Sequence, residues 1–217
     1  MKKYTTQYLL TFLLLSQAAF FELRILEATV FENGGFSRMH YLIIPGLNNS
    51  GPSHWQTFWT KSLPSASRVY QRCWDKPQKE EWVETLDKFI RQQKDDTILV
   101  AHSLGVVTTV LWLLRAGRQG SIPSNIKGAF LVTPADVERV AHIQNFAPIP
   151  SEKLPVPACV VGSENDPYMT LERVEFFAKV WGTRLFNAGA LGHINSESNL
   201  GEWEQGRKFL AEFEGGL

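Results

Sequence analysis

Residues 97–117 read TILVAHSLGVVTTVLWLLRAG, and the expected class of fold follows from them. Its first five residues, TILVA, are typical of a strand that is buried on both faces. The run LGVVTTVLWLLRAG that closes the stretch predicts an apolar helix, for which Gly117 is a suitable C-terminal cap. The stretch therefore predicts a buried strand that passes directly into a buried helix.

The same alternation of strand and helix extends from residue 39 to the end of the chain. Short apolar runs predict five further strands, and helical spacing of apolar residues predicts four further helices. The strands are expected at 40–45, 67–73, 128–134, 158–163 and 183–189, and the helices at 54–63, 80–93, 171–182 and 202–213. Continuous apolar strands joined by helices indicate a compact three-layer α/β sandwich with about six mostly parallel strands. The proline-rich residues 148–157 are expected to form a loop within this one domain.

Charge and cysteine content exclude several classes of protein. The 217 residues include 22 Lys and Arg against 22 Asp and Glu, so no net positive charge is available to attract nucleic acid or a membrane surface. Cys73 and Cys159 are the only cysteines, which excludes a disulfide framework and a cysteine-based zinc site. Metal, nucleotide and phosphate motifs are absent from the sequence, and we expect no cofactor and no metal.

Residues 1–38 are expected to lie outside the folded domain, which we assign to residues 39–217. Residues 8–21 form an uncharged, mostly apolar run of 14 residues, which is shorter than the roughly 20 residues that span a bilayer. Three interpretations remain open: an extension without a structural role, a signal peptide cleaved after Ala18, and a membrane anchor. We expect a cytoplasmic protein, or an exported one if residues 1–18 are a signal peptide. The chemistry predicted below uses only residues 39–217.

The residues that follow the central strand are the first candidates for chemistry. Ala101-His102-Ser103-Leu104-Gly105 matches the G-x-S-x-G nucleophile elbow, with alanine in the first glycine position. A sharp strand-to-helix turn crowds the residues two before and two after the serine, and Ala101 and Gly105 are both small. Ser103 is therefore the candidate nucleophile. The alternative is that Ser103 only caps the helix, which would not require small neighbours on both sides.

An acid and a base are expected after two later strands. Asp166 follows strand 158–163 and is the candidate acid, while Glu164 and Asp136 are its alternatives, and a plain turn residue or helix cap is another. His193 follows strand 183–189 on a glycine-flanked loop and is the candidate general base. The chain order Ser103, Asp166, His193 is the order of the Ser-Asp-His triad in α/β hydrolases.

The loop after the first strand is expected to complete the site. The backbone N–H of Leu104 and that of Leu47 are the candidate oxyanion-hole donors. Asn48 and Trp55 are candidate substrate contacts, although Trp55 and its neighbour Trp59 are also expected as core residues.

Four motifs give the chain a resemblance to a known family. PGLNNSGPSHWQ (45–56), VAHSLG (100–105), GSENDPY (162–168) and GHINSESNLGEW (192–203) resemble the small serine hydrolases that include bacterial YdeN and the retinoblastoma-binding serine hydrolase. The resemblance covers about residues 39–214. It implies a compact α/β hydrolase that lacks the first two strands and any large lid, with Ser103, Asp166 and His193 as its triad. Where many relatives have a Gly-rich or His-Gly sequence in the oxyanion loop, this chain has Pro45-Gly46. The Leu-x-Cys-x-Glu segment that engages the retinoblastoma protein is absent from the sequence, and that partner is not expected.

These observations predict a metal-independent serine hydrolase, expected to be a monomer, that acts on a small-molecule acyl substrate. Esters are the expected substrates, with amides and thioesters as alternatives. A non-catalytic or weakly active binding module with the same fold is the alternative function, since fold alone does not decide function.

Overall fold

The computed structural model describes residues 39–217, and the predictions for residues 1–38 lie outside this range. Six strands form one sheet in the order β2-β1-β3-β4-β5-β6, and every neighbouring pair is parallel. This confirms the predicted parallel sheet. The strands are β1 His40–Ile44, β2 Ala66–Arg68, β3 Thr97–Ser103, β4 Ile126–Pro134, β5 Ala158–Gly162 and β6 Arg184–Asn187.

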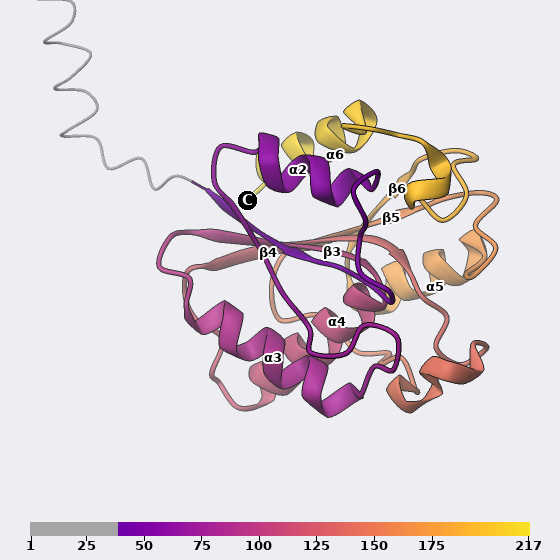
Figure 1. The fold of residues 1–217 in the computed structure, drawn as a ribbon. Coiled ribbons are helices and arrows are strands. Elements are labelled where there is room, and N and C mark those ends of the chain that lie inside the picture. Colours follow the sequence, from indigo (N-terminus) through magenta and orange to yellow (C-terminus); the bar gives the residue numbers. More distant parts are fainter. Residues whose placement is uncertain (1–38) are drawn as a thin grey trace, which may run out of the picture. The chain divides into compact units, whose positions relative to one another are not determined.

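Helices cover both faces of the sheet, as the apolar strands require. Figure 1 shows α2 and α6 on one face and α3 and α4 on the other. The side chains of α5 belong to the same apolar cluster as those of α3 and α4. The helices are α2 Trp55–Ser62, α3 Lys79–Arg91, α4 Leu104–Arg118, α5 Leu171–Trp181 and α6 Glu204–Glu214, with short 3-10 helices at Ala141–Phe146 and Ser196–Ser198.

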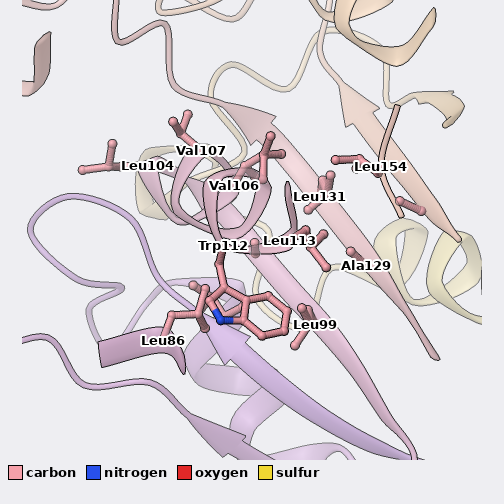
Figure 2. Packing of buried hydrophobic residues seen from close by; sticks show 14 of the residues in the cluster. Leu86, Leu99, Leu104, Val106, Val107, Trp112, Leu113, Ala129, Leu131 and Leu154 are labelled. Carbon is pink, nitrogen blue, oxygen red and sulfur yellow. The ribbon is translucent and has the colours of Figure 1, made fainter. Parts of the chain in front are cut away.

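The core consists of two apolar clusters that the sheet separates. Alternate residues of a strand point to opposite faces, so Leu99 of β3 joins the cluster under α3, α4 and α5, while Ile98 and Val100 join the cluster under α2 and α6. Figure 2 shows Trp112, Leu86 and Leu99 within the first cluster. Every residue of β3 is buried, because this strand lies in the middle of the sheet with helices on both sides.

The strand order places the ends of β1 and β3 next to each other. The chain passes from β1 to the edge strand β2 and then returns across β1 to β3, so the loops that leave β1 and β3 diverge. In open parallel sheets, a ligand cleft forms at such a switch in strand order, beyond the carboxyl ends of the strands. The fold therefore provides a site between the loop that follows β1 and the start of α4.

Two local predictions are wrong. The predicted strand 67–73 is shorter, because only Ala66–Arg68 pair with β1 and the chain then leaves the sheet edge toward an exposed Tyr70. Gly117 does not cap α4: the helix continues to Arg118, Gln119 is its C-cap, and Gly120 takes the left-handed conformation. Gly117 instead packs against Pro155, where an added Cβ would lie 3.0 Å from the proline ring.

We predict that Gly105→Ala destabilises the fold. A Cβ at position 105 would lie 2.4 Å from the carbonyl oxygen of Ile44 and 2.7 Å from that of Pro45, so the start of α4 would have to move away from β1. Overpacking of this kind costs about 1–3 kcal/mol, which urea unfolding would measure. Gly51→Ala is the matched control, because nothing lies within 4 Å of its added Cβ. Equal free energies of unfolding for the two variants would contradict the proposed crowding.

Candidate active site

Ser103 occupies a strained turn between β3 and α4. Its backbone has φ 55° and ψ −122°, a conformation that is costly for any residue except glycine and that is concentrated at functional sites. The turn is tight enough to bring a Cβ at Gly46 within 2.8 Å of the Ser103 Cβ. Ser103 makes no side-chain cap hydrogen bond to α4, so the alternative in which it only caps the helix is wrong.

The structure brings Ser103, His193 and Asp166 together in a hydrogen-bonded chain. His193 Nε2 lies 2.8 Å from Ser103 Oγ, and His193 Nδ1 lies 2.9 and 3.0 Å from the two carboxylate oxygens of Asp166. A carboxylate only accepts hydrogen bonds, so Nδ1 carries the proton and Nε2 is free to accept from the serine hydroxyl. The imidazole is therefore in the tautomer that a general base requires.

Asp166 is held by its own turn, and its two alternatives lie elsewhere. The backbone N–H of Tyr168 donates to Asp166 Oδ1 at 2.9 Å, which orients the carboxylate toward His193. Asp136 is fully buried after β4 and forms an ion pair with Arg173 Nε at 2.8 Å. Glu164 is exposed and accepts a hydrogen bond from Asn187. Neither alternative carboxylate has a hydrogen bond to His193.

The loop after β1 contains a backbone N–H that is free to donate. The Leu47 N–H forms no hydrogen bond within residues 39–217, although its neighbours do: the Asn48 N–H donates to Trp74 and the Asn49 N–H donates back to Gly46. Leu104 is the first residue of α4, where N–H groups have no partner within the helix. The two N–H groups predicted as oxyanion-hole donors therefore belong to segments that meet at Ser103, through the contact of Gly46 described above.

Arg68 of β2 holds this loop by hydrogen bonds. The sequence did not predict this role. Its guanidinium donates to the Asn49 side chain, to the Ser50 carbonyl at 2.8 Å and to Thr57 Oγ1 at 2.9 Å. Arg68 is buried, it forms no ion pair within the described chain, and burial lowers its pKa. Asn48 and Asn49 both have positive φ in the loop that it holds. No motif marks Arg68, because the contact depends on how β2 lies against β1.

A cavity of about 450 Å³ opens over Ser103, which is within the size range of small-molecule sites. Asn48, the candidate substrate contact, is among its lining residues. Tyr168 also lines it, with its ring edge-on to that of His193 and the two ring centroids 4.6 Å apart. The cavity is lined by Leu47, Asn48, Asn49, His54, His102, Ser103, Ala135, Val140, His142, Ile143, Tyr168, His193, Asn195, Ser196 and Glu197.

Trp55 does not line this cavity, contrary to its prediction as a substrate contact. It is buried between Trp59 and Trp203, in the core under α2 and α6. The indole N–H of Trp55 donates to the carbonyl oxygen of Ile194 at 2.8 Å. Trp55 therefore contacts the loop that carries His193 from within the core. His54, its neighbour in the sequence, lines the cavity instead.

Three imidazoles lie in a row beside the serine. The ring centroids of His54 and His102 are 4.7 Å apart, and those of His102 and His193 are 5.0 Å apart. Burial, followed by the charges of Arg68 and His193, lowers the pKa of His54 to about 3. Burial also keeps the pKa of His102 well below its usual value. His54 and His102 therefore stay neutral where most enzymes work. The sequence shows both histidines but not their burial.

Within residues 39–217, no group of three or more His, Cys, Asp or Glu side chains has the arrangement of a metal site. No helix in the described part of the chain combines the length and apolar character needed to cross a bilayer.

The fold and the position of the serine define the class of protein. A parallel sheet covered by helices, with a serine on a strained strand-to-helix turn after a central strand, is an α/β hydrolase. Residues 41–212 match the serine hydrolase family, and the chain belongs to that family. The predicted fold and family resemblance are both confirmed.

Solved structures of similar proteins agree with this assignment. A putative YdeN-like hydrolase from Pectobacterium atrosepticum is 31% identical with a TM-score of 0.71, covering 88% of this chain and 95% of that one. The ydeN gene product from B. subtilis is 18% identical with a TM-score of 0.66, covering 82% and 99%. Est1E from Butyrivibrio proteoclasticus is 14% identical with a TM-score of 0.62, covering 85% and 91%. The last two share the fold. A search among curated proteins found no match.

We predict that His54→Asn reduces the loss of stability in acid. The pKa of His54 is about 3 in the folded protein and about 6.5 in an unfolded chain, so between these values the unfolded chain binds one more proton. The free energy of unfolding therefore falls as the pH decreases below about 6.5, by up to about 1.4 kcal/mol per pH unit for this one histidine. Asparagine keeps a side-chain acceptor for the Gln56 N–H that His54 caps but does not titrate. Urea unfolding between pH 7.5 and 5 should give a shallower slope for the variant, and parallel slopes would contradict the prediction.

Proposed function

We propose that the protein hydrolyses small acyl esters through Ser103, His193 and Asp166. The observation that carries the proposal is the continuous hydrogen-bonded chain from Ser103 Oγ through both nitrogens of His193 to the carboxylate of Asp166. Nucleophile, base and orienting acid within hydrogen-bond distance are the geometric signature of nucleophilic acyl transfer. Membership of the serine hydrolase family supports the same chemistry.

In the first half of the reaction, Ser103 Oγ attacks the acyl carbonyl while His193 Nε2 takes the hydroxyl proton. The resulting imidazolium is stabilised by Asp166, which stays ionised and keeps the ring oriented. The tetrahedral intermediate then collapses, His193 returns the proton to the leaving alcohol, and an acyl-serine remains. In the second half, water loses a proton to His193 Nε2 and attacks the acyl-serine. Collapse releases the carboxylic acid and regenerates the Ser103 hydroxyl.

The developing negative charge on the carbonyl oxygen needs donors that are fixed before the reaction begins. The Leu104 and Leu47 N–H groups are the donors we assign to this role. Leu104 also lies at the N-terminus of α4, where the helix dipole favours negative charge. Arg68 supports the arrangement indirectly, because its hydrogen bonds to residues 49 and 50 hold the loop that carries Leu47.

The cavity supports a small acyl substrate. Four of its lining residues are apolar, and all four belong to or pack against the apolar cluster under α3, α4 and α5: Leu47, Ala135, Val140 and Ile143. The acyl group is assigned to the part of the cavity that these apolar residues line, and the leaving group to the part lined by the polar residues Asn195, Ser196 and Glu197. Ester hydrolysis is the proposed reaction, and amides and thioesters would pass through the same intermediates. Est1E, which shares the fold, has been solved with bound ferulic acid.

We predict that Ser103→Ala abolishes covalent labelling by a fluorophosphonate probe and lowers turnover of p-nitrophenyl acetate by about 10⁶-fold, because the triad nucleophile is lost. Labelling is read by intact mass and by the modified peptide. The Ser103→Ala protein should still fold, since the hydroxyl makes no cap bond to α4 and its hydrogen bond is to His193. Retained labelling at another serine, such as Ser53 or Ser163, would overturn the assignment.

Asp166→Asn should lower kcat by roughly 10⁴-fold, because an amide can donate to Nδ1 and so favour the wrong tautomer of His193. Glu164→Gln is the matched control, since Glu164 lies on the same turn but its side chain contacts Asn187 instead of His193. The measurement is kcat for p-nitrophenyl acetate, expressed per titrated active site. Similar losses in the two variants would remove Asp166 from its proposed role.

A further inference from the structure

The backbone carbonyl oxygen of His193 accepts two side-chain hydrogen bonds. His102 Nε2 lies 2.9 Å from it, and Thr133 Oγ1 lies 3.0 Å from it. Both donors are buried. His102 precedes Ser103 on β3, and Thr133 lies on the neighbouring strand β4. The strand that carries the nucleophile and one of its two neighbours therefore both hold the backbone of the base.

Thr133 reaches this position because β4 has a bulge. His102 pairs with Val132 whereas Ser103 pairs with Pro134, so Thr133 is an extra residue in β4 with no partner on β3. Its φ is 41°, which is strained for a β-branched side chain. Bulges next to active sites often redirect a side chain. Here the redirected group is a hydroxyl that donates to the His193 carbonyl.

The proton that His102 donates is fixed by its environment. A carbonyl oxygen only accepts hydrogen bonds, so Nε2 carries the proton. The ring is buried against His54 and His193, and this burial keeps its pKa well below the usual value. The hydrogen bond from His102 to the His193 carbonyl is therefore maintained without a change of charge across the working pH range.

The segment that carries His193 needs such restraint. Gly192 and Ile194, on either side of His193, both have positive φ, and this segment joins no strand. Ile194 is β-branched, and its carbonyl oxygen accepts the indole N–H of Trp55. Two consecutive carbonyls, those of His193 and Ile194, are thus held by side chains from β3, β4 and α2.

We propose that His102 and Thr133 are positioning residues that fix the backbone of His193, so that Nε2 stays within hydrogen-bond distance of Ser103. The inference rests on the proposed function, in which His193 is the base. Neither residue touches the reacting atoms through these bonds. Their effect is on geometry, and misplacement of a catalytic group by about 1 Å can cost 10²-fold in rate.

Thr133→Val tests the inference, because valine keeps the size and the β-branch but lacks the hydroxyl. Thr133→Ser restores the hydroxyl, and Thr97→Val is the matched control. Thr97 is also a buried threonine whose hydroxyl donates to a backbone carbonyl, but it lies at the opposite end of β3. His102→Gln, which can place an amide N–H near the position of Nε2, is compared with His102→Leu. Each variant is assayed with p-nitrophenyl acetate for kcat and KM per titrated active site, for its rate of fluorophosphonate labelling and for its unfolding temperature.

We expect Thr133→Val to lower kcat and the labelling rate by about 10-fold with KM nearly unchanged, because only the approach of base and nucleophile is impaired. The plateau of kcat/KM against pH should fall without a shift in the pH of its midpoint. Thr133→Ser and His102→Gln should recover most of the activity, and Thr97→Val should lower the unfolding temperature but not kcat.

Three outcomes would overturn the inference. The first is a wild-type kcat per active site in Thr133→Val, and the second is a rise in KM at constant kcat. The third is a loss of kcat in Thr97→Val equal to that in Thr133→Val, which would indicate a general effect of stability. If Thr133→Val fails to fold, His102→Gln is compared with His102→Leu. Equal values of kcat per active site in these two variants would then overturn the inference. Absence of fluorophosphonate labelling in the wild-type protein would instead refute the proposed function, and the inference with it.

Discussion

The structure depends on one sharp turn, in which the chain leaves β3 and enters α4 through Ser103. This turn requires a positive φ at Ser103 and the close approach of α4 to the end of β1. The approach leaves no room for a Cβ at Gly105 or Gly46, where an added atom would lie within 3 Å of other backbone or side-chain atoms. Because the loop after β1 packs onto the same turn, one steric constraint sets the position of the serine, the start of α4 and the Leu47 N–H. This arrangement is part of the folded structure itself, which is what the proposed stabilisation of an oxyanion requires.

The parallel sheet explains why residues far apart in sequence reach this turn. All six strands point the same way, so the segments after β1, β3, β4, β5 and β6 emerge at one edge of the sheet. Asp166 and His193 follow the two strands on one side of β4, and the loop with Leu47 follows the neighbour of β3 on the other side. The strands have apolar residues on both faces, and this double burial holds the sheet between two layers of helices. The core therefore fixes where each strand ends, and the strand ends carry the polar residues.

The sequence predicts those parts of the site that depend on local pattern. The elbow around Ser103, the strand ends before Asp166 and His193, and the parallel sheet all follow from runs of a few residues. Features set by contacts between distant segments were not predicted. These are the short length of β2, the hydrogen bond from Arg68 to the Asn49 side chain, and the bulge at Thr133. Trp55 shows the limit well. Its position beside the oxyanion loop left both a substrate contact and a core position open. Trp55 packs in the core under α2, whereas its neighbour His54 lines the cavity.

Backbone strain and buried polar groups occur together at the carboxyl edge of the sheet. Ser103, Thr133 and Ile194 all have positive φ, and each is a residue for which this conformation is costly. Hydrogen bonds that cross between elements offset this cost: His102 and Thr133 donate to the His193 carbonyl, and Trp55 donates to the Ile194 carbonyl. Relaxing the strain at Thr133 would require its hydroxyl to leave the His193 carbonyl, and the buried acceptor would then lose one of its two partners, at a cost of about 0.5–1.5 kcal/mol. The strained backbone and the hydrogen bonds are therefore stable only together. This mutual dependence keeps the imidazole close to the serine although the segment that carries it belongs to no strand.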